Sequence, residues 1–137
     1  MGMIHANIEI LNAEDIALNQ RHYIGEDEIR QVNVSCLVDT GSAMMVINEE
    51  IRAALELRIK DQRPSQQADG TRVTLPVAGP IEIRFEGRFC TTNALVLSDD
   101  SEVLLGVIPM EEMDLWLNPT RQMLTFAHPE GPVMMLK

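Results

Sequence analysis

Residues 35–42 read Ser35-Cys36-Leu37-Val38-Asp39-Thr40-Gly41-Ser42, an apolar run that ends in an acidic residue and a glycine. Apolar and polar residues alternate just before this run, which predicts a half-buried strand. At Leu37 and Val38 the alternation stops, so we expect the strand to enter the core there on both faces. A carboxylate directly after a buried strand is costly unless it is hydrogen-bonded or functional. Asp39 is therefore the first candidate functional residue, and Gly41 permits a tight turn after it.

Short strands separated by turn signals surround this stretch, and this pattern predicts a closed or sandwiched β-domain. Asn12 and Asn48 are N-cap candidates, each followed by acidic residues in the first turn of an expected helix. Asp69-Gly70 predicts a two-residue hairpin turn, and Gly79-Pro80 is expected to end the strand that follows. The other expected strands cover residues 4–11, 29–38, 43–47, 81–85, 89–97, 115–117 and 122–126. The hairpin is expected over residues 64–75, with its second strand running on to residue 77, and the expected helices cover residues 12–19, 49–57 and 109–114.

Composition limits the function classes. The chain has 137 residues, 45% of them hydrophobic, which is enough for one folded domain. Its formal net charge of -10 argues against binding nucleic acid or anionic lipid through a basic surface. No apolar run approaches the ~20 residues of a membrane span, and residues 1–6 lack the pattern of a secretory signal. We therefore expect no nucleic-acid partner, no membrane association and a cytoplasmic location.

The cysteines and histidines predict no catalytic or metal site. Cys36 and Cys90 each lie in a strand-like run, so we interpret them as buried small apolar residues, with a disulfide left open. The three histidines are scattered and lack the spacing of metal ligands. None lies in a suitable context beside a serine or cysteine nucleophile. We expect neither a metal nor a cofactor.

The carboxyl of Asp39 has a specific chemical use. Two carboxyls about 3 Å apart cannot both ionise in a low-dielectric site, so they share one proton. The ionised carboxyl then takes a proton from water, and the protonated one donates a hydrogen bond to a substrate carbonyl. The chain repeats neither Asp-Thr-Gly nor Asp-Ser-Gly, so a second carboxyl of this kind has to come from another copy. A turn-forming aspartate before glycine is the alternative interpretation.

Three segments carry a resemblance to a known family. Asp39-Thr40-Gly41-Ser42 after an apolar strand resembles the active-site signature of aspartic proteases. Residues 104–111, Leu-Leu-Gly-Val-Ile-Pro-Met-Glu, resemble the apolar-apolar-Gly segment that these enzymes thread beside the active-site loop. Residues 68–71, Ala-Asp-Gly-Thr, are similar to a stretch that recurs in bacterial and archaeal clan AA members. Because the chain is short and carries the signature once, it resembles the retropepsin-like branch, in which two identical chains each supply one aspartate.

The resemblance covers residues 29–126 and implies an all-β, retropepsin-like closed β-domain, the acid protease fold, with one or two short helices. We expect residues 1–137 to form this single domain, with extensions at both ends of the 29–126 core. An apolar tail at residues 133–136 is expected to pack on a partner. The resemblance also implies an aspartic endopeptidase that acts as a homodimer on a peptide or protein substrate. A catalytically inactive module that binds extended peptides on the same fold is the alternative.

Roles for individual residues also follow from the resemblance. Asp39 would be the catalytic carboxylate, and the Thr40 hydroxyl would bond across the two-fold axis. Gly41 would let its backbone approach the carboxyls, and Ser42 would hydrogen-bond the outer oxygen of Asp39. Asp69 and Gly70 would lie at the tip of a flap over the substrate, although this expected flap is neither glycine-rich nor aromatic. Apolar pocket residues are expected among Met44, Val46, Ile81 and Leu105.

Overall fold

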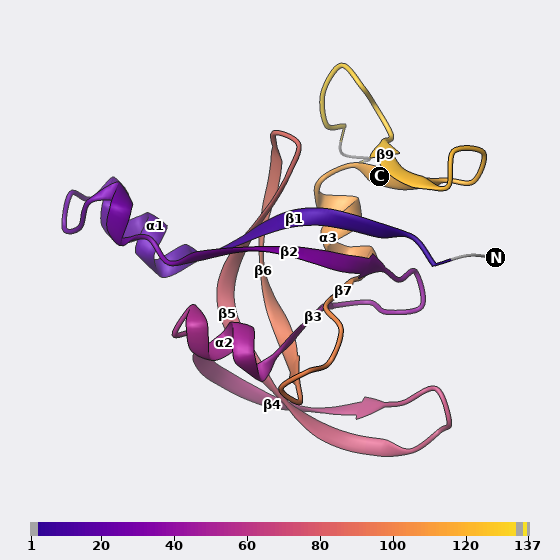
Figure 1. The fold of residues 1–137 in the computed structure, drawn as a ribbon, viewed down its shortest axis with the longest axis horizontal. Helices are drawn as coiled ribbons and strands as arrows, with labels where there is room; N and C mark the ends of the chain where they lie inside the picture. The colour runs from indigo at the N-terminus through magenta and orange to yellow at the C-terminus, as the bar shows by residue number, and fades with distance from the viewer. Residues whose placement is uncertain (1–2, 134–135, 137) are drawn as a thin grey trace.

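The computed structural model describes residues 3–133 and residue 136. It is mostly β-structure with a few short helices (Figure 1). The strands are β1 (His5–Asn12), β2 (Gln31–Val38), β3 (Met45–Asn48), β4 (Arg58–Gln66), β5 (Arg72–Phe85), β6 (Arg88–Leu97), β7 (Leu104–Leu105), β8 (Leu115–Asn118) and β9 (Met123–Phe126). The helices are α1 (Ala13–Gln20), α2 (Glu49–Ala54) and α3 (Val107–Glu112), with a 3₁₀ turn, η1 (Glu26–Glu28).

Six of the strands close into a mixed barrel. Their order around the ring is β1-β2-β7-β3-β6-β5, and β5 returns to pair with β1. The β2–β7 and β3–β6 pairs are parallel, and the other neighbours are antiparallel. The closed barrel confirms the predicted fold class. It also shows that β1, which precedes the expected 29–126 core, closes the barrel by pairing with both β2 and β5.

The barrel is filled by the apolar face of each strand. In β2, Cys36 and Val38 are buried and Val34 is half-buried, whereas Asn33 and Ser35 are exposed. This confirms the predicted alternation. The side chains that the core encloses completely are mostly branched and aliphatic, which suits a pleated surface covered on one side. They include Ile10, Met45, Ile47, Ile81, Ile83 and Leu105.

Two asparagines start helices, as their sequence context predicts. The Asn12 side chain accepts a hydrogen bond from the Asp15 backbone N–H at 3.1 Å, and Asn48 accepts one from Ile51 at 2.9 Å. Each satisfies a backbone donor that the first helical turn leaves without a partner. Helix α2 ends at Ala54, before the expected residue 57. The longest α-helix among the described residues has eight residues, and none is long and apolar enough to cross a membrane.

Strand boundaries differ from the prediction in two places. Strand β3 begins at Met45 rather than at residue 43, because the preceding residues form the bends that follow the Asp39 turn. Strand β5 does not end at Gly79-Pro80 but continues to Phe85. Its pairing register with β6 shifts between Ala78 and Ile81, so the glycine marks an irregularity within one long strand.

The C-terminal part consists of the hairpin β8–β9 and a short tail. The hairpin agrees with the two strands predicted around the turn at residues 118–121. Phe126 packs against Phe85 in an edge-on arrangement with the ring centroids 6.3 Å apart. The expectation that residues 133–136 pack on a partner falls partly on residues 134 and 135, which lie outside the described residues. Val133 and Leu136, at either side of them, are exposed.

Candidate active site

Asp39 follows β2 directly, at one end of the barrel. Its backbone N–H donates to the carbonyl oxygen of Leu105 at 3.0 Å and so extends the parallel β2–β7 pairing by one residue. Val38 is buried and Asp39 is only half-buried, so the chain leaves the core at this residue. The carboxylate is therefore held on a rigid element but open to solvent in the single chain.

A tight turn orients the Asp39 carboxylate. The Gly41 backbone N–H donates to Asp39 Oδ1 at 2.9 Å, and the Ser42 N–H donates to the Asp39 carbonyl oxygen at 3.2 Å. A Cβ at position 41 would lie 3.2 Å from Asp39 Oδ1, so the backbone can come this close to the carboxylate because residue 41 has no side chain. The local chain thus fixes one carboxylate oxygen and leaves the other free for further partners.

The segment after β7 passes beside this turn and is joined to it by backbone hydrogen bonds. The Val107 N–H donates to the Ser42 carbonyl oxygen at 2.8 Å, and the Ile108 N–H donates to that of Ala43 at 2.9 Å. Gly106 lies at the crossing, where a Cβ would come within 2.9 Å of three backbone oxygens. This is the arrangement that the resemblance of residues 104–111 predicted.

Within the described residues, the side chains of Thr40 and Ser42 form no hydrogen bond with the Asp39 carboxylate. The Ser42 hydroxyl donates to the Met44 carbonyl oxygen at 3.1 Å, instead of to Asp39 as the resemblance implied. The backbone of residues 42–44 bends back within reach of this hydroxyl, so the local acceptor takes the hydrogen bond. Thr40 is exposed, and its predicted bond across a two-fold axis stays a prediction because it requires a second copy.

The expected flap is a longer hairpin than the sequence predicted. Strands β4 and β5 pair from Arg58 opposite Gly79 to Gln66 opposite Arg72, and residues 67–71 form the tip. The tip is a five-residue connection with a Gln67–Thr71 hydrogen bond, not a two-residue turn. It contains Asp69 and Gly70, and Gly70 has a φ of +88° that favours glycine.

Asp69 organises the tip. Its Oδ1 accepts the Thr71 backbone N–H at 2.9 Å, and this hydrogen bond lowers the pKa of the Asp69 carboxyl. The carboxylate therefore stiffens the turn of the hairpin. Whether Asp69 and Gly70 also contact a substrate stays a prediction.

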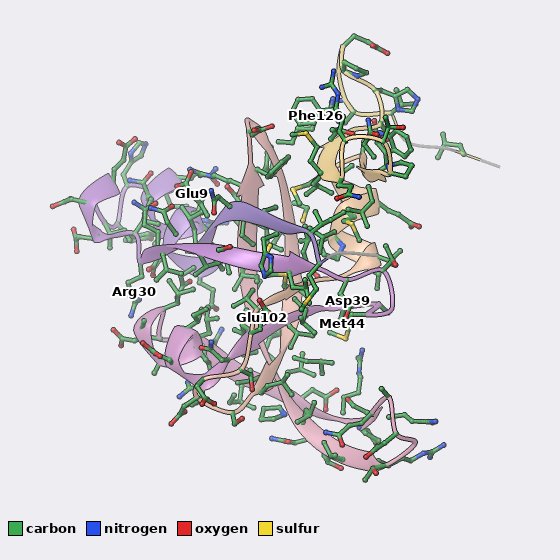
Figure 2. All side chains as sticks on the ribbon, turned by 45° about the vertical axis from the view of Figure 1, so that its right-hand side comes forward. Glu9, Arg30, Asp39, Met44, Glu102 and Phe126 are labelled. Atoms are coloured by element: carbon green, nitrogen blue, oxygen red, sulfur yellow. The ribbon has the colours of Figure 1, made fainter. Side chains whose placement is uncertain are left out.

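The hairpin touches the Asp39 loop at a residue that sequence reasoning missed. Arg63 Nη1 on β4 lies 3.1 Å from Met44 Sδ, two residues after Ser42. In Figure 1 the hairpin projects from the barrel on the side where the chain leaves β2, and Figure 2 shows Asp39 and Met44 close together at this end. The only sequence signal was a basic residue within an uninterrupted polar stretch, which did not predict a strand.

Three of the four expected pocket residues lie in the barrel interior. Ile81 and Leu105 are fully buried and Val46 is 5% exposed, so they hold the fold together and cannot line an open cleft. Met44, which is half-buried beside the Asp39 turn, stays available for a ligand. The prediction of Val46, Ile81 and Leu105 as pocket residues was therefore wrong, because apolar strand residues near a motif are more often core than pocket.

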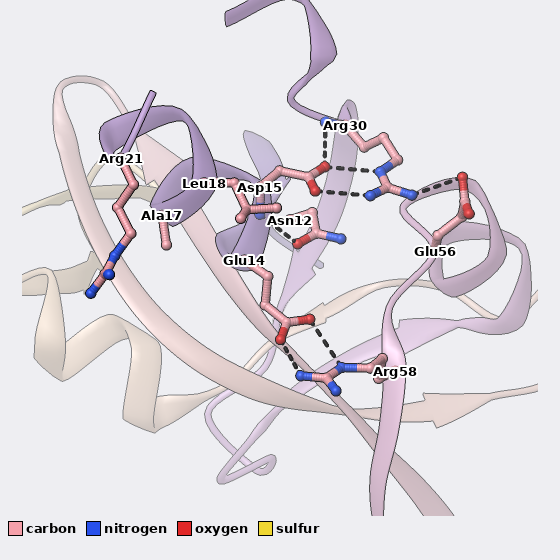
Figure 3. A pocket seen from close by; sticks show the side chains of 9 residues that line it. All are labelled: Asn12, Glu14, Asp15, Ala17, Leu18, Arg21, Arg30, Glu56 and Arg58. Atoms are coloured by element: carbon pink, nitrogen blue, oxygen red, sulfur yellow. Dashed lines mark hydrogen bonds and ion pairs between the residues drawn. The ribbon is translucent and has the colours of Figure 1, made fainter. Parts of the chain in front are cut away.

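A hollow of about 590 Å³ lies elsewhere, between α1 and the residues around α2 (Figure 3). Its walls contain ion pairs that join these segments: Arg30 with Asp15 and Glu56, and Arg58 with Glu14. Asp39 is not among the residues that line this hollow. Because five of the charged side chains there, Glu14, Asp15, Arg30, Glu56 and Arg58, are paired with one another, we interpret it as a structural junction.

A closed mixed barrel that carries an Asp-Thr-Gly-Ser turn, crossed by a second apolar-Gly segment, defines the class of aspartic-type peptidases. Comparison with known families agrees. The aspartyl protease family model matches residues 26–107, more than half of the chain, from η1 to the first residue of α3. The chain therefore belongs to the aspartyl protease family, in its retropepsin-like form. No curated protein matches the sequence.

Proposed function

We propose that this protein is an aspartic endopeptidase that is active as a homodimer. The observation that carries the proposal is the state of Asp39 in the single chain. Its carboxylate is fixed by the Gly41 N–H and by the β2–β7 pairing, yet it remains half-exposed at the end of the barrel. A carboxyl in this position becomes enclosed when a second copy covers it, and the chain offers no second Asp-Thr-Gly motif of its own.

Two-fold symmetry supplies the second carboxyl. In an isologous dimer a residue near the axis faces its own symmetry mate, so Asp39 would face Asp39 of the other copy. Thr40, which is exposed next to it, would bond across the same axis. The dimer would bury both carboxylates and exclude bulk water, and the like-charge repulsion would then leave one proton shared by the pair.

The reaction would proceed by general acid–base catalysis without a covalent intermediate. The ionised Asp39 removes a proton from a water molecule between the two carboxyls, and the water oxygen attacks the carbonyl carbon of the peptide bond. The protonated Asp39 donates a hydrogen bond to the carbonyl oxygen. Collapse of the tetrahedral intermediate breaks the C–N bond, and a proton from the pair goes to the leaving amine. The hairpin β4–β5 would close over the peptide during these steps.

The test is cleavage of fluorogenic peptide mixtures at roughly pH 4 to 7 by the wild type and by Asp39→Asn. We expect Asp39→Asn to keep the fold, as judged by circular dichroism, and to lose about 10³-fold or more in rate. Asp99→Asn, at an exposed loop position away from the site, is the matched control and should keep the wild-type rate. Cleavage by Asp39→Asn at the wild-type rate would refute the proposal. Peptide binding that is equal in wild type and Asp39→Asn, with no cleavage by either, would indicate the peptide-binding module.

A further inference from the structure

The hairpin β4–β5 differs in charge from the rest of the chain. From residue 58 to residue 75 it has a net charge of +2, whereas the whole chain has -10. The remaining surface repels an anionic peptide, so the hairpin is the part of the active-site end that can attract one. Its basic residues are Arg58, Lys60, Arg63 and Arg72, and its acidic residues are Asp61 and Asp69.

The strand register shows which basic residue faces the Asp39 loop. Residues directly opposite each other in an antiparallel pair share one face of the sheet. Arg63 is opposite Leu75 and Ser65 is opposite Val73; these three neighbours of Arg63 are all half-buried. Arg72 belongs to the other face and is exposed. Arg63 is therefore on the inner face of the hairpin.

Arg63 has unused hydrogen-bonding capacity. Its contact with Met44 Sδ at 3.1 Å shows that the side chain reaches toward the Asp39 loop, but a thioether is a weak acceptor. Arg63 forms no ion pair within residues 3–133 and 136, whereas Arg30, Arg52 and Arg58 each pair with a carboxylate. A guanidinium with free N–H donors at this place can bind a carboxylate through two parallel hydrogen bonds.

We propose that Arg63 determines substrate specificity by binding a carboxylate of the peptide that lies between the hairpin and the Asp39 loop. The inference rests on the proposed function, which places the peptide there. Asp61 lies on the same face of the hairpin, two residues closer to the barrel, and would repel an acidic substrate group bound next to it. A substrate carboxylate is therefore favoured at one position along the cleft, opposite Arg63.

The flanking surface indicates what surrounds this carboxylate. Val73 and Leu75 on the inner face of the hairpin, and Met44 across from it, are apolar and half-buried. We therefore expect substrates with an acidic residue among apolar ones. In the proposed dimer each copy contributes one Arg63, so an acidic residue on either side of the cleaved bond would be accepted. A free C-terminal carboxylate offers the same chemistry from a different source.

The first experiment measures binding to the full-length Asp39→Asn protein, which would hold a peptide without cutting it. The probes are fluorescent peptides that are identical apart from glutamate or glutamine at one central position, each with a free or an amidated C-terminus. We expect the glutamate peptide to bind about tenfold tighter, equivalent to ~1.4 kcal/mol, with the difference decreasing at high salt. Adding Arg63→Gln should remove this difference. Arg72→Gln, on the outer face of the same hairpin, is the matched control and should leave it unchanged.

A second variant, Arg63→Glu, should invert the preference in favour of lysine-containing peptides. A tenfold effect of C-terminal amidation in place of the side-chain effect, still lost in Arg63→Gln, would support the proposal with the chain terminus as the carboxylate source. Equal binding of all four peptides, or a preference that survives Arg63→Gln, would overturn it.

The second experiment compares kcat/KM of the wild type for the glutamate and glutamine peptides. The expected ratio is again about tenfold. Cleavage that depends on Asp39 but ignores the charge would overturn the role of Arg63 and leave the proposed function standing. A binding preference that depends on Arg63, without any cleavage by the wild type, would reject the proposed peptidase and show that Arg63 selects the bound peptide in the peptide-binding module instead.

Discussion

Gly106 and Met44 approach so closely that a Cβ at position 106 would lie 2.3 Å from the Met44 carbonyl oxygen. The backbone angles of Gly106, φ -88° and ψ -177°, are available to any residue. The space beside the Asp39 loop, and not the local conformation, thus demands glycine. The contact joins two of the three segments that carry the family resemblance, residues 39–42 and 104–111, and determines the path of residues 42–44.

Gly106→Ala tests this junction. The added methyl group would force the loop away and break the Val107–Ser42 and Ile108–Ala43 hydrogen bonds, since the obstructing atoms are backbone oxygens. We expect the free energy of unfolding to fall by about 3 kcal/mol and peptide cleavage to be lost. Urea denaturation followed by far-UV circular dichroism measures the first effect.

Gly25→Ala is the control for that substitution. A Cβ at position 25 would meet Asp27 Oδ1 at 2.7 Å, but this is the end of a flexible, exposed side chain that can turn away. The expected change in unfolding free energy is within ~0.5 kcal/mol. Equal stability of the two alanine variants would contradict the assigned role of Gly106.

Mixing wild-type and Asp39→Asn subunits tests whether two copies share one site. If each site needs Asp39 from both chains, only wild-type dimers cut peptide. In an equimolar mixture that has exchanged subunits, about a quarter of the dimers are of this type. Activity per total protein should therefore fall to about a quarter of the pure wild-type value. A fall to about a half would mean that each chain works independently. The control is the same mixture measured before the subunits have exchanged.

Local signals in the sequence were sufficient for the elements that lead to the site. The alternation in residues 29–38 predicted β2, and Asn12 and Asn48 marked the starts of α1 and α2, because a cap and a strand face each depend on nearby residues. The Asp39 turn and the crossing segment with Gly106 were found from their resemblance to a family.

Elements that depend on distant partners were harder to predict. Nearly every residue of β4 is exposed, so no hydrophobic pattern revealed that it pairs along the length of β5. Because β4 was not predicted over its full length, neither the inner face of the hairpin nor the position of Arg63 could be inferred. Gly79-Pro80 resembled a strand end, but β5 pairs with β4 and β6 before these residues and with β6 and β1 after them, and this pairing outweighs the local turn signal.

The two cysteines should be unreactive in the folded protein. Both are free and buried, and burial raises the pKa of the Cys36 thiol to about 11 and that of Cys90 to about 12. At about pH 8 little thiolate is present, so we expect slow reaction with a disulfide reagent until a denaturant is added. Both thiols should then react quickly. A count below two in the denatured, unreduced protein would show that a disulfide had formed.

The ion pair between Asp15 and Arg30 should stabilise the fold at the acidic pH at which the proposed pair of Asp39 carboxyls would act. Asp15 is 2% exposed and accepts two hydrogen bonds from the Arg30 guanidinium, at 2.8 Å each, and one from its backbone N–H. The hydrogen bonds from Arg30 lower the Asp15 pKa below its ordinary value of 3.8. The unfolded chain therefore binds this proton more readily, and stability falls only as the pH drops below about 4 toward the folded-state pKa.

Asp15→Ala removes this support. It leaves Arg30, whose side chain is 39% accessible, with Glu56 as its partner, and we expect a loss of about 2 kcal/mol in the free energy of unfolding near neutral pH. Because the variant lacks the group that titrates, its deficit relative to the wild type should shrink as the pH falls below about 4. Glu14→Ala breaks the exposed pair with Arg58, whose side chain is 74% accessible, and should cost less than ~1 kcal/mol. Urea denaturation at several pH values measures all three proteins, and a deficit in Asp15→Ala that is independent of pH would rule out the ion pair as its cause.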